Sequence, residues 1–467
     1  MPVQRDPGQP QSAPTAGLVL HTATCDITPD PGHPLGGYAA RGDAGALGRH
    51  DPLQATLICL SAGPCSAAWL TLDSIAVDVS LAEDLRAVVG KALAIPPEHV
   101  VVCASHTHSG PAGWVGALHP ADTEEREDDL VAELVAAVGA LAEDAATTAQ
   151  PVEAHWCLAA TPGVAANRQG PQGPHDDRTG VLVLRAPGGT VQALLYDHAG
   201  HPTVLGPENL LWSADWPGAA RAVLGGALAA VAAFAGAPST PPPAIGFLQG
   251  PAGDASPRLL RRGRDFAEVA RFGAVLAGPV LRAVHEEARA LVPGALPRVL
   301  RTTVELPVRP SPTAAEAARE LAAAEAAWRP LAGTPQTPQA RIAATRLDGA
   351  RRQVRLVEAA LPGTLRLPIS VVTLGGLAWV HLPVELTGAL AERIVAAGAP
   401  DTVRVVGYSD GYFGYVTDDA AHRAGTYEAL SSLFTADAAQ TLVARAVALL
   451  AQATAGPAGG PGSASET

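Results

Sequence analysis

The sequence has few charged residues, few aromatic residues and a surplus of acidic over basic ones. Charged residues make up 16% and apolar residues 48% of the 467 positions, which permits a large buried core and argues against global disorder. The sequence has 32 Lys and Arg and 45 Asp and Glu, which gives a net charge of −13. No basic run or aromatic-basic stripe offers a footprint for a phosphate backbone. We therefore predict a globular protein that does not bind nucleic acid.

The sequence also lacks paired cysteine motifs and a secretory signal. Its five cysteines contain no CxxC pair, and an odd number cannot all be paired within one chain. Residues 1–16 have no apolar signal segment, so we expect free thiols and a cytoplasmic location. The most hydrophobic stretch, residues 219–235, is mostly Ala and Gly and contains Arg221. It is short and only weakly hydrophobic for a membrane span, which needs about 20 residues. We predict a buried helix there, no transmembrane segment, and no particular oligomeric state.

Both ends of the chain have loop composition without periodicity. We predict disordered tails at residues 1–16 and 456–467, and a single catalytic domain over residues 17–455. Near its start the domain shows an apolar strand (67–72), a helix (81–93) and a second apolar strand (99–104). This order is a βαβ unit, so the two strands should be parallel neighbours.

The rest of the domain mixes helices with antiparallel strands. A helix is predicted over residues 128–143, and strands 180–185 and 191–196 flank a Pro-Gly-Gly turn typical of a hairpin. Residues 311–361 are rich in Ala, Glu and Arg, which predicts a helical hairpin that packs on the domain and is a candidate lid. The predicted fold is therefore α/β, with a mixed sheet core, flanking helices and a helical hairpin insertion.

The first candidate site is the segment Ser105–Pro111 (SHTHSGP), which directly follows a predicted buried strand. Loops at the carboxyl ends of parallel strands commonly carry active sites. An HxH pair in extended chain points its side chains to opposite faces, so one of His106 and His108 would hold a metal while the other faces substrate. The alternative is a pair of polar loop histidines.

Other segments supply further candidate ligands. His198 or His201 follows a second strand, and the glycines of residues 247–257 permit close approach of the backbone to a ligand. Glu385 ends an apolar run, where a carboxylate is costly to bury without a partner, although it could also be an acid at a helix N-terminus. Residues 407–428 contain four of the six tyrosines, a concentration typical of a ligand pocket.

Taken together, these segments resemble the neutral/alkaline, non-lysosomal ceramidases, a family of zinc hydrolases. The resemblance covers roughly residues 17–433. The matching pieces, in chain order, are Cys25–Pro29, Gly36–Ala39, the HTHSGP run, Asn167-Arg168, His201–Thr203, Ser213–Asp215, Gly253–Pro257, Pro383–Glu385, Gly414–Val416 and Tyr427-Glu428.

The resemblance implies a site for Zn²⁺ and roles for further residues. Zinc would be held by His106, His201, Glu385 and Tyr415, with water in the remaining position. His108, Arg168 and Tyr427 would surround the scissile carbonyl, and Ser256 and Asp254 would lie near the polar head of the substrate. Trp114 and Leu118, just after the HTH loop, are candidates for an acyl groove or are ordinary core residues.

The reaction implied is addition of water to an amide carbonyl, since a metal lowers the pKa of water towards about 7 and polarises the carbonyl oxygen. Arg168, His108 and Tyr427 would stabilise the oxyanion and pass a proton to the amine, without an assignment of the general base. Ser256 is a weak candidate nucleophile because no G-x-S-x-G motif surrounds it. The alternatives are a zinc esterase or amidase of small polar substrates, and an inactive metal-binding protein.

The sequence also differs from the better-known ceramidases. It shows no secretion signal, and it ends without the additional C-terminal β domain of those longer enzymes. We therefore expect a small-molecule N-acyl amide or lipid as substrate, with the acyl length and the amine left open.

Overall fold

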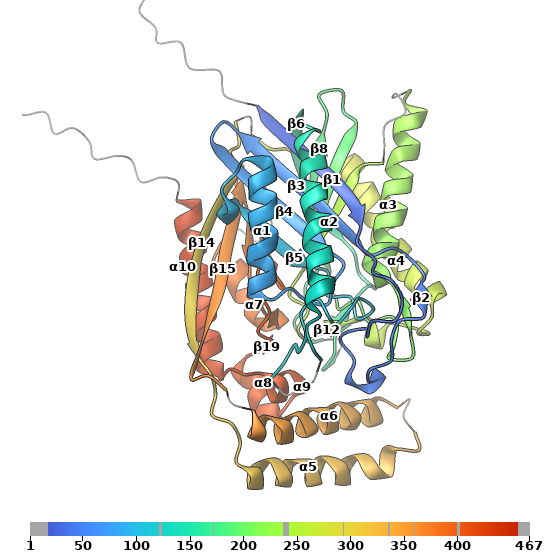
Figure 1. Ribbon diagram of the computed structural model, residues 1–467, viewed down its shortest axis with the longest axis vertical. Helices are drawn as coiled ribbons and strands as arrows, with labels where there is room; N and C mark the ends of the chain where they lie inside the picture. The colour runs from blue at the N-terminus through green and yellow to red at the C-terminus, as the bar shows by residue number, and fades with distance from the viewer. Residues whose placement is uncertain are drawn as a thin grey trace, which may run out of the picture.

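The computed structural model describes residues 17–120, 124–170, 172–236, 242–292, 294–334, 337–359, 361–398 and 402–455. The tails predicted at 1–16 and 456–467 lie outside these ranges. Figure 1 shows mixed sheets with helices on their outer faces and a pair of helices across one end. The predicted α/β class, with its mixed sheet core, flanking helices and helical hairpin, is confirmed.

The larger sheet has nine strands. Its path runs β11 (Ala244–Gln249), β9 (Val191–His198), β8 (Arg178–Arg185), β6 (Gln150–Ala160), β1 (Leu18–Asp26), β3 (Gln54–Ala62), β4 (Cys65–Leu72) and β5 (Val100–Ala104), and β13 (Arg289–Ala290) pairs with β6. The pairs β4–β5 and β9–β11 are parallel, and β8–β9 is antiparallel. The predicted parallel neighbours and the predicted hairpin are thereby confirmed.

Helix α1 (Val79–Leu93) joins β4 to β5 and has a clear local cause. The Asp78 carboxylate caps it by accepting the Leu81 amide at 2.6 Å, which satisfies one free N–H of the first turn. Leu81 and Leu85, one turn apart, are both fully buried. They pack in one apolar cluster with residues of α2 (Asp128–Ala146), which is the helix predicted near residues 128–143.

A four-stranded sheet packs against the larger one. Its order is β14 (Arg298–Pro307), β15 (Thr364–Leu374), β16 (Leu377–His381) and β18 (Val403–Val406). A shared core cluster joins both sheets, and the rings of Trp69 on β4 and Trp379 on β16 meet edge to face with centroids 5.5 Å apart. Three two-stranded sheets complete the core: β17 (Glu385–Leu386) with β19 (Tyr415–Val416), β7 (Ala166–Asn167) with β12 (Ala255–Ser256), and β2 (Gly48–Arg49) with β10 (Leu211–Trp212).

Helix α3 (Asp215–Phe234) corrects one prediction. It packs beside α4 (Phe266–Glu286) through an inner face that includes Leu224, but Val231 is 49% and Phe234 99% exposed. The prediction of a buried helix is therefore wrong, because an Ala- and Gly-rich sequence does not show which face is covered. Within the described residues α3 alone is long and apolar enough, by length and composition, to cross a membrane.

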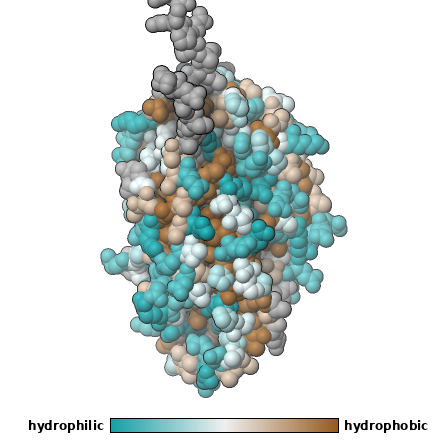
Figure 2. All heavy atoms as spheres, turned by 90° about the vertical axis from the view of Figure 1, so that its left-hand side faces the viewer, coloured by the Kyte–Doolittle hydropathy of each residue, from teal (hydrophilic) through white to brown (hydrophobic). Residues whose placement is uncertain are grey.

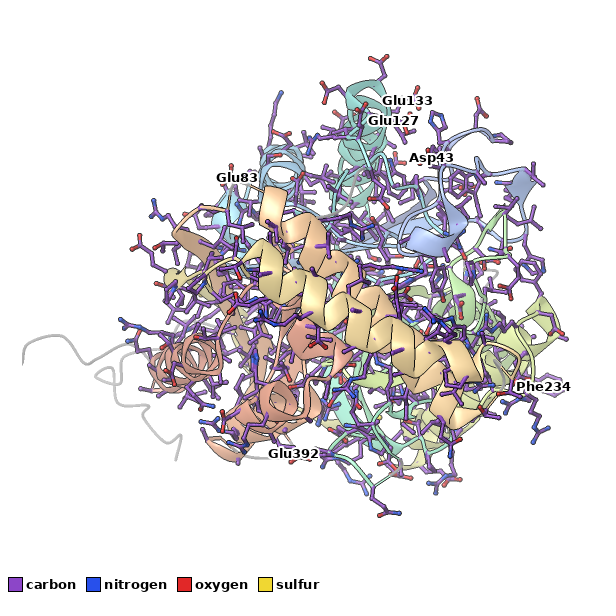
Figure 3. The ribbon with its side chains drawn as sticks, turned by 90° about the horizontal axis from the view of Figure 1, so that it is seen from below. Asp43, Glu83, Glu127, Glu133, Phe234 and Glu392 are labelled. Atoms are coloured by element: carbon purple, nitrogen blue, oxygen red, sulfur yellow. The ribbon has the colours of Figure 1, made fainter. Side chains whose placement is uncertain are left out.

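Helices α5 (Ala314–Trp328) and α6 (Pro338–Glu358) form the predicted hairpin and lie across one end of the molecule (Figures 1 and 3). The side chains of Thr313 and Glu316 make a capping box that starts α5. Helix α6 packs against α9 (Tyr427–Ser431), so the hairpin contacts a segment that carries a predicted site residue. The remaining helices are α7 (Gly388–Ala396), α8 (Asp419–Ala424) and α10 (Ala436–Thr454).

The surface and the thiols fit a globular chain. Hydrophilic side chains cover most of the face on the α10 side, with apolar ones visible between them (Figure 2). All five cysteines are free, as predicted; Cys59, Cys103 and Cys157 are buried, whereas Cys25 and Cys65 are half-buried. The predicted cytoplasmic location stays a prediction.

We predict that Trp114→Ala destabilises the fold strongly. Trp114 is 1% exposed and packs in the apolar cluster formed with α1 and α2, so the truncation leaves a cavity that costs about 3–5 kcal/mol. Phe234→Ala is the matched control, because that ring is 99% exposed at the end of α3 (Figure 3), and its effect should stay within about 0.5 kcal/mol. Chemical denaturation of both variants measures the difference, and equal effects would contradict the packing described.

Candidate metal centre

The candidate site lies where several strands end. The segment carrying His106 and His108 follows β5, and His201 follows β9. Glu385 begins β17, four residues after β16 ends, and its register partner in the parallel pair β17–β19 is Tyr415. Because the carboxyl ends of parallel strands share one edge of a sheet, residues nearly three hundred positions apart meet here.

Backbone hydrogen bonds fix the His106 loop on the end of β4. The Ser105 amide donates to the Leu72 carbonyl and the His106 amide to the Ser74 carbonyl, both at 2.8 Å. His106 has a positive φ of 65°, in the left-handed region that few non-glycine residues adopt. The prediction of an extended HxH with opposed side chains is therefore wrong. The rings of His106 and His108 lie on one side, with centroids 5.0 Å apart.

Each of two histidines is oriented by a backbone carbonyl. Nδ1 of His106 lies 2.6 Å from the Ile75 carbonyl, and Nδ1 of His201 lies 2.6 Å from the Ala252 carbonyl. A proton on Nδ1 donates to that carbonyl in each case, so Nε2 is left as the ring nitrogen with a free lone pair. The Nε2 atoms of His106 and His201 lie 3.4 and 3.1 Å from one carboxylate oxygen of Glu385.

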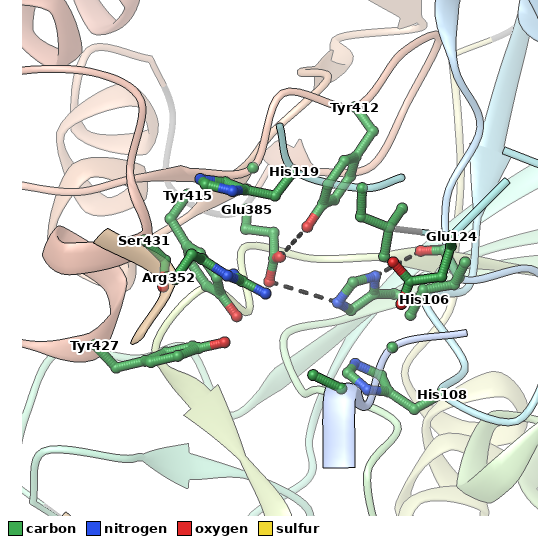
Figure 4. Close-up of a pocket in the computed structure, with 15 residues that line it drawn as sticks. His106, His108, His119, Glu124, Arg352, Glu385, Tyr412, Tyr415, Tyr427 and Ser431 are labelled. Atoms are coloured by element: carbon green, nitrogen blue, oxygen red, sulfur yellow. Dashed lines mark hydrogen bonds and ion pairs between the residues drawn. The ribbon is translucent and has the colours of Figure 1, made fainter. Parts of the chain in front are cut away.

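The carboxylate of Glu385 is buried and surrounded by polar groups. The Tyr412 hydroxyl donates to Oε1 (Figure 4). The Tyr408 hydroxyl lies 3.3 Å from Oε2. Burial raises the pKa of this carboxyl, but His106 and His201 lower it more, so the pKa lies well below its usual range. Glu385 is therefore an anion that two imidazole nitrogens face.

The donor set fits a metal ion. His106, His108 and His201 offer ring nitrogens within 4.8 Å of one another. Nε2 of both His106 and His201 has no hydrogen-bond partner within the described part of the chain. Burial lowers the pKa of His201, and an imidazole must be neutral, just as a carboxylate must be ionised, to bind a metal. Imidazole and carboxylate are ligands that zinc accepts, so this cluster could hold such an ion.

Tyr415 lies beside the cluster and next to two other predicted residues. Its ring meets that of Tyr427 edge to face with centroids 5.6 Å apart. The guanidinium carbon of Arg168 lies 5.8 Å from the Tyr415 ring centre and 5.9 Å from that of Tyr427. Burial and the charge of Glu385 raise the pKa of Tyr415 well above its usual value, against the opposing effect of Arg168. Tyr415 is therefore a protonated phenol in the metal-free protein.

Arg168 is held from several sides. Its guanidinium donates to the Gly253 carbonyl and forms an ion pair of 3.0 Å with Glu428. Burial lowers the pKa of Arg168, but Tyr415 and Glu428 raise it by more than that, so the pKa lies well above its usual value. The charge of Arg168 is thus fixed beside the two tyrosines.

His108 completes one wall of the cavity. Its ring packs against Tyr38 with centroids 4.7 Å apart. A Cβ at Gly37, which has a φ of 91°, would lie 2.4 Å from Nδ1 of His108, so only glycine fits there. Burial lowers the pKa of His108 well below its usual value, helped by His106 and His201. Neither ring nitrogen has a hydrogen-bond partner among the described residues.

The three predicted substrate-binding residues lie outside the cavity lining. Both Asp254 carboxylate oxygens accept protein hydrogen bonds, at 2.8 Å from Asn167 and 2.9 Å from the Gly388 amide, which ties its loop to α7. Burial raises the pKa of Asp254 to about 6. Ser256 is 2% exposed and its hydroxyl accepts the Arg258 amide. Trp114 is an ordinary core residue, which was the alternative to a place in an acyl groove.

Tyr408 and Tyr412 were not assigned by sequence reasoning. The clustering of tyrosines in residues 407–428 was the available signal, but it did not show which hydroxyls reach Glu385. Tyr408 has a φ of 52°, and its carbonyl accepts the Ala104 amide at 3.0 Å, which attaches this loop to the end of β5. His198, the alternative ligand, is buried against Thr179 and Trp216 instead.

The cavity at the cluster has a volume of about 60 Å³. Site residues line it together with Leu118, His119, Glu124 and Arg352, the last of which lies on α6. Figure 4 shows the labelled residues around the cavity. Leu118, one of the two acyl-groove candidates, is thus a lining residue.

Comparisons with known proteins agree with this architecture. No protein-family model and no curated protein sequence matches the chain. The solved structure of a neutral ceramidase from Pseudomonas aeruginosa superposes with a TM-score of 0.72 at 19% identity, covering 94% of this chain and 75% of that one. A ceramidase complexed with C2 gives a TM-score of 0.70 at 18% identity, over 94% and 76%. The resemblance predicted from the sequence is confirmed at the level of the fold.

We predict about one zinc per chain, lost in variants of the converging ligands. His106→Ala, His201→Ala and Glu385→Ala each remove a group that faces the cluster, so each should bind little metal after dialysis. His198→Gln is the control, because that buried imidazole faces Thr179 and should keep the metal. Elemental analysis measures the metal content of each variant. Metal loss in His198→Gln together with metal retention in His201→Ala would show that the ligand is His198 and that our choice of His201 is wrong.

Proposed function

We propose that this chain is a zinc-dependent amidohydrolase that cleaves ceramide-like or other N-acyl amine lipids to a fatty acid and a free amine. The observation that carries the proposal is the convergence of His106 Nε2 and His201 Nε2 on the buried Glu385 carboxylate. The shared fold of solved ceramidases supports it. Tyr415, the register partner of Glu385, completes the proposed ligand set. Bound zinc supplies an activated water and polarises the carbonyl oxygen.

The chain's own residues divide the remaining work. Arg168 keeps its positive charge beside Tyr415 and Tyr427, which suits stabilisation of negative charge on the former carbonyl oxygen. The Tyr427 hydroxyl points into the cavity and is a second donor (Figure 4). We assign proton transfer to His108, because its imidazole is neutral and both ring nitrogens lack a partner among the described residues.

The two tyrosines should separate in a mutational test. Tyr415→Phe removes a proposed ligand and should weaken zinc retention. Tyr427→Phe and Arg168→Gln should keep the metal and lower kcat about a hundredfold or more, the usual cost of one donor to a developing oxyanion. Zinc content and kcat are measured on the same preparations. Because Arg168→Gln leaves the buried Glu428 without its ion-pair partner, the Tm of that variant is measured to check that it is still folded. Equal zinc loss in all three variants would contradict this division.

A second candidate function is a zinc esterase or amidase of small polar substrates. The cavity of about 60 Å³ favours it, because pockets for drug-sized ligands occupy about 300–1,000 Å³. Its outer part is also lined by the polar residues His119, Glu124 and Arg352. A lipid would require α6, which carries Arg352, to move away from the core.

Acyl length distinguishes the two candidates. For a lipid hydrolase, kcat/KM on N-acyl amines should rise with each added CH₂ by at most about fourfold, the equivalent of 0.8 kcal/mol, until the pocket is filled. Leu118→Ala should flatten this rise with zinc content unchanged, since Leu118 lines the cavity. A flat dependence in the unmodified enzyme, with fast turnover of acetyl amides, would support the small-substrate enzyme.

A further inference from the structure

A group of arginines lies beside the candidate site in an otherwise acidic protein. The segment Arg258–Arg264 (RLLRRGR) contains four arginines and no acidic residue. The expectation of a sequence without a basic run overlooked this segment, because the overall charge of −13 hides it. Its first arginine reaches α6 of the hairpin, and a later one reaches the loop that carries His201.

Arg258 donates from its guanidinium to neutral oxygens. Its guanidinium lies 3.2 Å from the Thr345 hydroxyl and 3.2 Å from the Arg341 carbonyl, both on α6. Its backbone follows β12 closely, and the carbonyl of Ala255 on β12 accepts the His201 amide at 3.0 Å. The half-buried Arg258 therefore stands between the strand behind His201 and the hairpin.

Arg261 repeats this pattern on the other side of the same loop. Its guanidinium donates to the Thr203 carbonyl and lies 3.4 Å from the Val204 carbonyl, directly after His201. Like Arg258 it is half-buried. Two guanidinium groups thus flank the His201 loop, and both form hydrogen bonds to carbonyl or hydroxyl oxygens in place of carboxylates.

Three of the nearby acidic groups already have arginine partners, whereas the buried Asp215, whose charge acts on Arg261, accepts backbone amides. Asp348 on α6 pairs with Arg351 at 3.7 Å, Glu208 with Arg264 at 3.6 Å, and Glu428 with Arg168 at 3.0 Å. Burial and, after it, the charges of Arg168, Arg261, Arg341 and Arg264 together lower the pKa of Arg258 to about 10. A positive potential therefore remains at the flank of the site.

Arg258 does not line the cavity itself, but it bonds to α6, which contributes a lining residue. Thr345 and Arg352 are seven residues apart on α6, about two turns, and so lie on one face of the helix. Arg352 lines the cavity beside Tyr427 and Ser431 (Figure 4). Between them, Gly349 packs close to Leu430 of α9, the helix that begins at Tyr427. Arg258, bonded to Thr345, therefore stands beside the route from the metal cluster to the hairpin.

We propose that the substrate carries a carboxylate on its amine portion, as in an N-acyl amino acid, and that Arg258, assisted by Arg261, binds this group. This inference rests on the proposed amide hydrolysis: water adds to the acyl carbon, the C–N bond breaks, and the nitrogen takes a proton to leave as a free amino acid. The acyl chain is apolar, so only the amine portion can carry the acid. A guanidinium binds a carboxylate through two parallel hydrogen bonds, and a carboxylate offsets the cost of half-buried positive charge.

The test compares two substrates that differ in charge alone. N-hexanoylglycine and N-hexanoylethanolamine have the same acyl chain and nearly the same size, and both dissolve as monomers, so no lipid surface is present. The zinc-loaded enzyme should show a kcat/KM ratio of at least about ten in favour of the glycine amide. Arg258→Gln should lower that ratio about tenfold or more, the scale of one charge-assisted pair. Arg258→Lys keeps the charge but loses the two parallel hydrogen bonds, so it should retain only part of the ratio.

Arg282→Gln is the matched control. Arg282 is an exposed arginine on α4 that pairs with Glu287 at 3.0 Å, and its loss should leave the ratio unchanged. A wild-type enzyme that cleaves the ethanolamide as fast as the glycine amide, or faster, overturns the inference but leaves the proposed hydrolase intact. Turnover of neither amide by zinc-loaded protein would instead remove the proposed function itself.

The competing occupant of these arginines is an anionic membrane surface. Vesicles containing phosphatidylserine provide the probe, with phosphatidylcholine vesicles as reference. If Arg258→Gln weakens binding to the anionic vesicles while the substrate ratio stays at the wild-type value, the inference is overturned in favour of a membrane. A lowered substrate ratio with unchanged vesicle binding supports it.

Discussion

The buried carboxylate of Glu385 is the group on which the rest of the site depends. An ionised carboxylate away from water is costly unless charged or hydrogen-bonding groups surround it, and here two imidazoles and two tyrosine hydroxyls do so. These four groups come from loops after β5, β9 and β18. Because this single buried charge needs all four partners, it ties together the ends of strands from both sheets. In the proposed holoenzyme a cation would also stabilise the carboxylate.

Close backbone approach makes this convergence possible. A Cβ at Gly253 would lie 2.7 Å from the Glu385 carbonyl, and the Gly253 amide donates to the Leu386 carbonyl at 2.9 Å. The same segment accepts the Arg168 amide and supplies the carbonyl that orients His201. Residues 252–255 are therefore a backbone scaffold that fixes the ligands, which explains why Asp254 and Ser256 form hydrogen bonds to the protein.

The hairpin adds a different kind of constraint. It covers one end of the site, and α6 contributes Arg352 to the cavity lining and Thr345 to the hydrogen bonds of Arg258. An acidic protein thus places positively charged side chains next to its candidate site. The field of such a group of charges acts over several ångströms and attracts anions.

Local patterns in the sequence determined much of the fold and the chemical types in the site. The βαβ unit, the β8–β9 hairpin and the helices 314–328 and 338–358 follow from apolar spacing, caps and turn residues, all of which act over a few residues. The candidate ligand types were also visible, because histidines and an acid directly after apolar runs stand out against their surroundings.

Only the tertiary structure decided how those residues are oriented and what they contact. The positive φ of His106 turns both histidines of the HTH segment to one side, and it is held by contacts with residues 72–75. The hydroxyls of Tyr408 and Tyr412 reach Glu385 because their loop pairs with β5, three hundred residues earlier. Burial of Trp114, exposure of Phe234 and the gathering of arginines around Arg258 likewise depend on which distant elements pack together. The periodicity of apolar residues reflects only local structure. Contacts between elements far apart in the chain could therefore not be predicted from it.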